Sequence, residues 1–236
     1  MADSAYIAGL AIRGVDVSNP PRHSAVVRIT HWISALSFIG LLVSGIGILL
    51  AHPRFYWGET GGIGTPSLFD LPLPFMLGGP SGWGRYLHFQ SAWLCVLNGL
   101  LYVASGFAGR HFRNNLMPAR HDLAGSSIRR AFAKPDAADA LRYNPIQRIT
   151  YLIVIFGLFP LMIWTGLAMS PAVTSVFPVL VTVLGGHQCA RTIHFVASIV
   201  LVLFVFVHIA MVARSGFRKR VDAMITGRVA REMEGL

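Results

Sequence analysis

Long apolar stretches separated by polar, basic segments dominate the sequence. Four of them reach the roughly 20 residues that a helix needs to cross the apolar core of a membrane. They cover about residues 29–51, 86–109, 147–169 and 192–213. A fifth apolar run, 171–186, is too short to span and contains two prolines, so we interpret it as a re-entrant or surface segment. The pattern predicts an all-α integral membrane protein, folded as a bundle of four transmembrane helices.

The composition agrees with this interpretation. Hydrophobic residues make up 54% of the 236 residues and charged residues only 13%, a balance that a soluble domain of this size does not need. The first residues lack the basic start and short apolar core of a cleavable signal peptide. The first span is therefore expected to act as its own insertion signal.

The positive charge is distributed unevenly along the chain. Three Lys and Arg residues precede the first span, eight lie in the loop 110–148 and six follow residue 213, whereas the other two loops hold only Arg54, Arg85 and Arg191. Because basic loops stay in the cytoplasm, both termini and the middle loop are expected on the cytoplasmic side of a bacterial inner membrane. This topology accounts for the net charge of +10, so binding of nucleic acid is not expected.

The same rule predicts the organisation of the chain. A cytoplasmic segment, 1–28, precedes a four-helix membrane domain, 29–213, and a basic cytoplasmic tail, 214–236, follows it. A long periplasmic loop, 52–85, joins the first two spans.

Two histidines, His194 and His208, lie inside the last apolar run. Fourteen residues are almost four helical turns, so both side chains lie on nearly the same face, about 21 Å apart along the axis. An ionisable side chain within a bilayer usually marks a functional site, because transferring it from water costs free energy. The last span therefore predicts two sites, one near each membrane surface.

Each of these histidines has a possible partner at its own depth. His31 begins the first span on the cytoplasmic side, level with His208, and His88 begins the second span on the periplasmic side, level with His194. Two imidazoles that face each other across a helix bundle are the axial ligands expected of a b-type haem. The sequence thus predicts two haem b groups, with these four histidines as the iron ligands.

Three of the four histidines follow an arginine by three residues: Arg28, Arg85 and Arg191. This spacing stacks each arginine on the face of its histidine, one turn nearer the water. Arginine binds carboxylates well, so the three are candidates for the haem propionates. Each alone could equally be an interfacial anchor, but the repetition favours propionate binding.

The other conspicuous residues have simpler interpretations. Five histidines lie in loops or at span edges, where solvated or capping roles are expected: His23, His52, His111, His121 and His187. Cys95 falls within a span and Cys189 in a predicted loop, and the chain has no CxxCH or CxxC motif. Small residues within the spans would let a flat macrocycle approach a helix, although ordinary helix packing uses such residues too. They are the SGIG stretch 44–47, which includes Gly45, together with Gly99, Gly106 and Gly166.

The histidine pattern resembles that of the bacterial di-haem cytochrome b561 family. The shared features are RxxHW in the first span, one histidine at the start of the second, none in the third and two spaced by fourteen in the fourth. The resemblance covers about residues 22–225, and the family includes cytochrome b subunits of hydrogenases, formate dehydrogenases and thiosulfate-reductase-type enzymes. Residues 143–171 also resemble the third span of subunits paired with periplasmic molybdopterin oxidoreductases. The resemblance implies His31, His88, His194 and His208 as haem ligands.

The long outer loop is rich in glycine, proline and aromatic residues. We interpret it as a docking surface for a periplasmic redox partner, with exposed Phe55, Tyr56 and Trp57. The alternative is a flexible loop that binds no partner.

No nucleotide-binding loop or nucleophile–base pair is visible, and all ten acidic residues lie outside the spans. We therefore expect the electron-transfer subunit of an oxidoreductase complex, which links the quinone pool to a periplasmic oxidoreductase subunit or soluble cytochrome. Quinone is expected near His31 and His208, with polar candidates at the cytoplasmic ends of the spans: His23, His111, Asn144 and Gln147. The resemblance to family members that work without a partner subunit implies instead that quinone reacts at the periplasmic haem.

Three alternatives remain open. One is a stand-alone quinone-linked oxidoreductase such as a superoxide oxidase, which would work without a partner. A histidine-lined metal or proton transporter and a mere membrane anchor belong to other classes, and both predict a colourless protein.

Overall fold

The computed structural model describes residues 24–62, 64–72, 82–109, 145–214 and 216–227. Four helical spans in these ranges are long and apolar enough to cross a membrane. They are α2 (Ala25–Ala51), α3 (Gly82–Ala108), a third span composed of α5 (Pro145–Ile153), η4 (Val154–Leu158) and α6 (Phe159–Ala168), and α9 (His187–Arg214). The predicted four-helix membrane fold is confirmed, and α9 begins five residues earlier than the predicted span.

Local sequence explains where several of these helices begin and end. Ser24 caps α2, because its hydroxyl oxygen accepts a hydrogen bond of 3.4 Å from the backbone N–H of Val27. Gly185 and Gly186, with φ of 84° and 116°, form the turn before α9. In the third span, the π turn η4 directly precedes α6, whose second residue is Pro160. Proline lacks an N–H, so the regular α-helical hydrogen-bond ladder cannot continue unchanged at this point.

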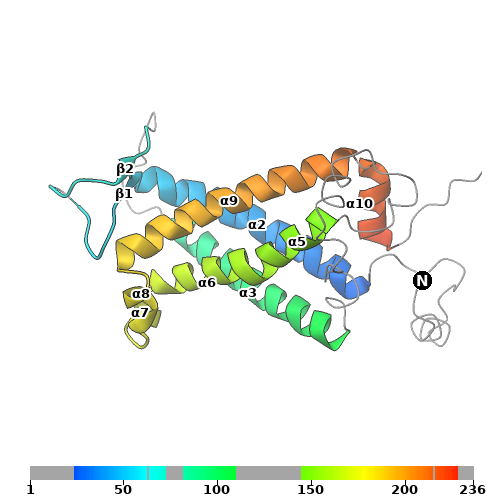
Figure 1. The fold of residues 1–236 in the computed structure, drawn as a ribbon, viewed down its shortest axis with the longest axis horizontal. Helices are drawn as coiled ribbons and strands as arrows, with labels where there is room; N and C mark the ends of the chain where they lie inside the picture. The colour runs from blue at the N-terminus through cyan, green and yellow to red at the C-terminus, as the bar shows by residue number, and fades with distance from the viewer. Residues whose placement is uncertain (1–23, 63, 73–81, 110–144, 215, 228–236) are drawn as a thin grey trace, which may run out of the picture.

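The helices form two antiparallel hairpins (Figure 1). One consists of α2 packed along α3, and the other of α6 packed along α9. Small and polar residues join the first hairpin: the amide nitrogen of Asn98 donates hydrogen bonds of 2.8 Å to the carbonyl oxygen of Thr30 and the hydroxyl of Ser34. A Cβ on Gly47 would lie 3.5 Å from the ring of Trp83. Close approach over small residues is the usual way in which membrane helices associate.

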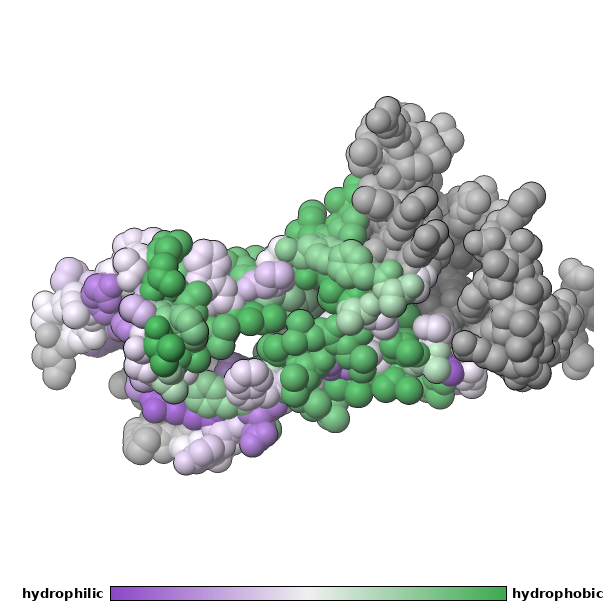
Figure 2. All heavy atoms as spheres, turned by 90° about the horizontal axis from the view of Figure 1, so that it is seen from below, coloured by the Kyte–Doolittle hydropathy of each residue, from purple (hydrophilic) through white to green (hydrophobic). Residues whose placement is uncertain are grey.

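The two ends of the bundle differ. At one end, β1 (Arg54–Phe55) pairs antiparallel with β2 (Phe69–Asp70), beside the start of α9. At the other end the chain turns at Gly216, and α10 (Phe217–Thr226) folds against the start of α2 (Figure 1). We call the end with the β-hairpin formed by β1 and β2 the hairpin end, and the other the α10 end. Apolar residues cover the middle of the molecule as a broad band, and hydrophilic residues gather at the hairpin end (Figure 2).

The apolar run 171–186 does not span the bundle. It forms two short helices, α7 (Pro171–Thr174) and α8 (Val179–Thr182), at the hairpin end. The indole N–H of Trp164 donates a hydrogen bond of 3.0 Å to the carbonyl oxygen of Leu180, and Val181 packs on Ala168 and Ala190. The segment is therefore held against the ends of α6 and α9 as a surface element.

The interior of the bundle is bordered by small side chains. Among the described residues, the largest completely buried side chains are Thr165, Cys189, Ser37 and Ser44. Protein interiors are normally filled to high density by larger apolar groups. Few large apolar side chains of the described residues are therefore completely buried.

Candidate functional site

Four histidines meet as two pairs between the hairpins. His88 of α3 and His194 of α9 have ring centroids 6.3 Å apart at the hairpin end. His31 of α2 and His208 of α9 have ring centroids 6.3 Å apart at the α10 end. The pairs that the helix directions predicted are adjacent in the structure. We call them the hairpin-end pair and the α10-end pair.

The ring separation fits a metal held between two imidazoles. Two metal–nitrogen bonds of about 2.0 Å each, with the distance from each nitrogen to its ring centre added, come to roughly 6 Å. Within the described ranges, no three or more His, Cys, Asp or Glu side chains group as a metal site. A structural zinc site needs four such ligands, whereas a haem needs only two axial ones.

Glycines border the hairpin-end pair. A Cβ on Gly45 would lie 3.9 Å from Cε1 of His88, and one on Gly166 would lie 3.7 Å from Cε1 of His194. Gly99 follows His88 by eleven residues, about three turns along the same face, and a Cβ there would meet nothing within 4 Å. These residues present bare backbone, which fits the flat faces of a haem.

Hydroxyl groups contact three of the four imidazoles. Ser44 lies 3.0 Å from Nδ1 of His88, and Thr165 lies 2.8 Å from Nδ1 of His194. The phenol of Tyr151 lies 3.4 Å from Nδ1 of His208. Nδ1 of His31 is buried and has no hydrogen-bond partner within the described residues. Sequence reasoning missed these hydroxyls, because each belongs to a different helix from the histidine that it contacts.

Two of the three arginines contact backbone carbonyls. Arg28 donates a hydrogen bond of 2.6 Å to the carbonyl oxygen of Ile225 in α10. Arg191 donates to the carbonyl oxygen of His52, and its guanidinium lies 4.8 Å from the centre of the Phe55 ring. Arg85 is exposed at the start of α3. Each guanidinium has five N–H donors, so one such bond leaves others for a carboxylate.

His52 follows α2 at the hairpin end and lies in an electropositive environment. Partial burial lowers the pKa of its imidazole, and the nearby positive charges of Arg191 and Arg85 lower this pKa further. His52 is therefore neutral around pH 7, and these two arginines supply the local positive charge.

The outer loop corrects one expectation. Phe55 and Tyr56 were predicted to be exposed, but they are only 2% and 7% exposed, whereas Trp57 is 61% exposed. The Phe55 ring lies 4.8 Å from that of Phe69 and 4.4 Å from that of Phe195, centre to centre. The loop folds back over the start of α9, and burial of these rings favours that arrangement.

Backbone hydrogen bonds hold the loop on α9. The carbonyl oxygen of Gly58 accepts hydrogen bonds from the N–H groups of Gln188 and Cys189, at 3.0 and 3.4 Å, and the N–H of Gly58 donates to Sγ of Cys189 at 3.0 Å. The first N–H groups of a helix have no partner within it, so the loop satisfies this end of α9. Cys189, expected in a loop, lies in the first turn of this helix.

Several predicted polar residues lie outside the described residues. His23, His111, His121 and Asn144 belong to undescribed segments, and Gln147 lies in α5 without a described side chain. The proposed roles of His23, His111, Asn144 and Gln147 at a quinone site therefore stay predictions.

A family comparison decides the class of protein. The model of the family described as prokaryotic cytochrome b561 matches residues 22–227. The chain belongs to this family. As a prokaryotic cytochrome b561 it is a multi-pass membrane protein that binds haem b and transfers electrons. Electron transfer is thereby favoured over the transporter and anchor alternatives.

Curated relatives of this cytochrome cover most of its length. A putative protein-methionine-sulfoxide reductase subunit, YedZ1 of Azospira oryzae, is 32% identical over 192 residues, which are 81% of this chain and 89% of that protein. The formate dehydrogenase cytochrome b556(fdo) subunit of Escherichia coli is 26% identical, over 87% of this chain and 83% of that protein. A probable Ni/Fe-hydrogenase B-type cytochrome subunit of Cupriavidus necator is 24% identical, over 93% and 90%.

Proposed function

We propose that this cytochrome relays electrons across the bacterial inner membrane between the quinone pool and a periplasmic redox partner. The observation that supports this proposal is the presence of two histidine pairs with the same 6.3 Å ring separation, one in each half of the bundle. Haem iron supplies one-electron chemistry, because it changes reversibly between its ferric and ferrous forms.

The four histidines would hold two haem b groups. His88 and His194 would bind one iron at the hairpin end, and His31 and His208 the other at the α10 end. Along α9 the two ligands are about 21 Å apart, so two groups of macrocycle size would bridge most of the apolar thickness. Gly45, Gly99 and Gly166 leave space for the macrocycles.

The three arginines would bind haem propionates. Each lies one turn closer to the end of the bundle than its histidine, which is where carboxylates would reach water. Nε of Arg28 is buried and has no hydrogen-bond partner within the described part of the chain, so this donor is available to an acceptor. For Arg191, the bond to the His52 carbonyl holds the guanidinium at the hairpin end of the bundle.

We assign the hairpin end to the periplasm and the α10 end to the cytoplasm. The positive-inside rule supports this orientation, because the segments before α2, between α3 and α5, and after α9 carry most of the Lys and Arg residues. The segments 1–28 and 214–236 would then be cytoplasmic, and 29–213 would be the membrane domain.

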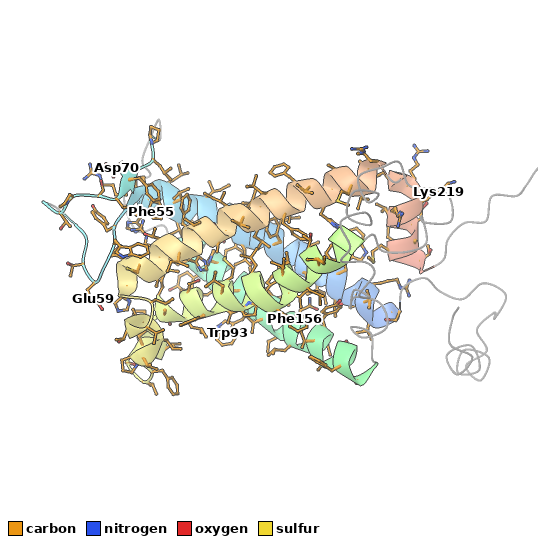
Figure 3. All side chains as sticks on the ribbon, viewed as in Figure 1. Phe55, Glu59, Asp70, Trp93, Phe156 and Lys219 are labelled. Atoms are coloured by element: carbon orange, nitrogen blue, oxygen red, sulfur yellow. The ribbon has the colours of Figure 1, made fainter. Side chains whose placement is uncertain are left out.

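The hairpin end would contact the redox partner, a periplasmic oxidoreductase subunit or a soluble cytochrome. Trp57 and Leu68 are exposed in the outer loop, and the charged side chains of Glu59 and Asp70 lie at the same end of the bundle (Figure 3). An exposed aromatic residue with a polar surround is typical of a protein-binding surface. The relatives are named as subunits of formate dehydrogenase, hydrogenase and methionine sulfoxide reductase systems. These names support a partner of the oxidoreductase class.

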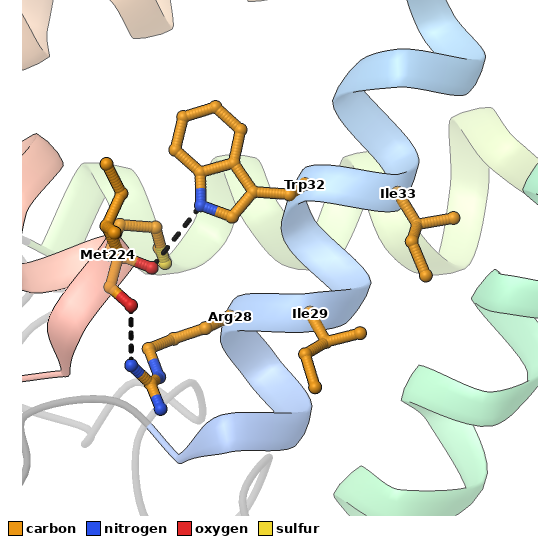
Figure 4. A pocket seen from close by; sticks show the side chains of 6 residues that line it. Arg28, Ile29, Trp32, Ile33 and Met224 are labelled. Carbon is orange, nitrogen blue, oxygen red and sulfur yellow. Dashed lines mark hydrogen bonds between the residues drawn. The ribbon is translucent and has the colours of Figure 1, made fainter.

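Quinone would react at the α10-end pair. An open hollow of about 590 Å³ lies between α2 and α10 and is lined by Arg28, Ile29, Trp32, Ile33, Met224 and Ile225 (Figure 4). The ring of Trp32 is 5.4 Å from that of His31, centre to centre. The hollow therefore combines an apolar lining with a cation and lies next to a proposed ligand, which suits an apolar molecule with a polar head.

A stand-alone quinone-linked oxidoreductase, such as a superoxide oxidase, is the second candidate. The burial of Phe55 and Tyr56 favours this candidate, because the apolar surface for a partner is smaller than the sequence predicted.

Isolation from the native membrane in a mild detergent tests the proposal. We expect two haem b per chain by pyridine haemochrome analysis and a co-purifying oxidoreductase subunit, or reduction of the haems by an added periplasmic cytochrome fraction. A haem content of one or none would contradict the two-haem relay. Two haems with quinone-linked activity in the isolated chain alone would favour the stand-alone alternative.

A further inference from the structure

The two imidazoles of the hairpin-end pair have matching partners. His88 of α3 is contacted by Ser44 of α2, and His194 of α9 is contacted by Thr165 of α6. Each hydroxyl thus reaches across its own helical hairpin to the histidine of the neighbouring helix. Ser44 and Thr165 are both 0% exposed, so water does not compete for these contacts.

Each hydroxyl also contacts its own helix. Oγ of Ser44 lies 2.6 Å from the carbonyl oxygen of Gly40, and Oγ1 of Thr165 lies 2.8 Å from that of Leu161. A carbonyl oxygen can only accept, and a hydroxyl has one hydrogen to donate. The single hydrogen of each hydroxyl is therefore used on the helix backbone.

It follows that both hydroxyl oxygens act as acceptors toward the histidines. The hydrogen between Oγ of Ser44 and Nδ1 of His88 must come from the imidazole, and the same holds for Thr165 and His194. A neutral imidazole carries one N–H, so Nε2 of each ring is left with its lone pair.

We infer that Ser44 and Thr165 are positioning residues, which hold His88 and His194 in the tautomer that binds iron through Nε2 and which raise the basicity of both ligands. This inference rests on the proposed ligation of haem by these histidines. A hydrogen bond from the second nitrogen of a ligating histidine orients the ring and makes it a stronger electron donor. A stronger donor favours ferric iron, so these hydroxyls lower the midpoint potential of the haem at this pair.

The α10-end pair lacks this arrangement. Tyr151 approaches Nδ1 of His208 only to 3.4 Å, and the buried Nδ1 of His31 has no partner within the described residues. The ligands of the two pairs thus differ in hydrogen bonding although their ring separations are equal. Removal of a hydroxyl should consequently affect one haem and not the other.

The test uses Ser44→Ala and Thr165→Val, which delete the acceptors while keeping helix-compatible side chains. Ser37→Ala is the matched control, because Ser37 is in the same helix, is equally buried and donates to the Ile33 carbonyl at 2.8 Å without contacting a histidine. Thr165→Ser restores the hydroxyl. Optical redox titration gives the midpoint potential of each haem, and electron paramagnetic resonance of the oxidised protein reports the axial ligand field.

We expect the midpoint potential of one haem to rise in both Ser44→Ala and Thr165→Val, with a changed resonance signal of that haem only. Ser37→Ala and Thr165→Ser should match the unmodified protein. If Thr165→Val loses this haem, retention of the haem by Thr165→Ser supports the inference, whereas loss in both variants points to packing and overturns it. Unchanged potentials in both hydroxyl deletions, or an equal shift in Ser37→Ala, also overturn it. A haem content below two in the unmodified protein contradicts the proposed function itself, and so the two failures can be told apart.

Discussion

Arg28 at the start of α2 donates a hydrogen bond to the carbonyl oxygen of Ile225, near the end of α10, and so joins the first and last described helices. The indole N–H of Trp32, one turn further along α2, donates to the neighbouring carbonyl of Met224 at 3.3 Å (Figure 4). Together these bonds hold α10 across the end of the bundle, where it forms one wall of the hollow beside His31.

Arg28→Ala should loosen α10. A hydrogen bond from a charged donor is worth about 1.5–3 kcal/mol, and this exposed one is expected at or below the lower limit. We expect faster trypsin cleavage at Arg218, Lys219 and Arg220, together with a higher KM for quinol. Arg54→Ala, at the opposite end of the bundle, is the control. Equal cleavage rates in both variants would show that Arg28 does not hold the helix.

Replacing single histidines should separate the two haems. His194→Ala should remove the haem of the hairpin-end pair and His208→Ala that of the α10-end pair, because each change deletes one axial ligand of one iron. Reduced-minus-oxidised spectra should retain about half of the α-band absorbance in each variant. His187→Ala, at the exposed first residue of α9, should retain all of it. Loss of both haems from either change would mean that the two sites form together or that the pairing is wrong.

Trp57→Ala should affect electron exchange with the partner, whereas Phe55→Ala should affect the stability of the fold. Trp57 is exposed, so its loss should slow electron exchange with the periplasmic partner while the haem content and thermal stability stay unchanged. Phe55 is buried against Phe69 and Phe195, and deletion of a buried phenylalanine typically costs about 3–5 kcal/mol. The second variant should therefore unfold at a lower temperature. Normal exchange rates in Trp57→Ala would remove this residue from the docking surface.

Gly186→Ala should destabilise the contact between the outer loop and α9. Gly186 has a φ of 116°, and an added Cβ would lie 2.5 Å from the carbonyl oxygen of Gly58. Such backbone strain costs about 1–3 kcal/mol, and relief of the clash would displace the loop. Accelerated reaction of the buried Cys189 with a thiol reagent would report this change. Gly62→Ala is the control, since a Cβ at that position meets nothing within 4 Å. Unchanged thiol reactivity in Gly186→Ala would contradict the prediction.

Acid should destabilise the hairpin end through His52. Its pKa is lowered in the folded protein by partial burial and by Arg191 and Arg85, so the unfolded chain binds the proton more readily. The stabilising contribution of neutral His52 is then complete above the ordinary value of 6.5 and is lost as the pH falls below it. We expect the melting temperature of the unmodified protein to fall more steeply below pH 6.5 than that of His52→Asn. Parallel pH profiles would exclude this role.

The sequence by itself determined the four spans and the end of the bundle near which each of the four paired histidines lies. Both follow from local properties: the length of each apolar run sets a span, and the helical period places His194 and His208 on one face. The bias in Lys and Arg then predicted the direction of each span, and the alternating directions placed His31 at the level of His208 and His88 at that of His194.

Tertiary structure alone decided which polar groups meet the histidines and what the outer loop covers. Ser44 precedes His88 by 44 residues and Thr165 precedes His194 by 29, so no helical period links either pair. Phe55 and Tyr56 have the composition of a binding surface, yet they are buried because the loop folds back over α9, with Gly58 bonded to residues about 130 positions later. The carbonyl partners of Arg28 and Arg191 likewise come from distant segments. Hydropathy and periodicity describe how one segment meets its solvent, whereas these contacts depend on which segments the packed helices bring together.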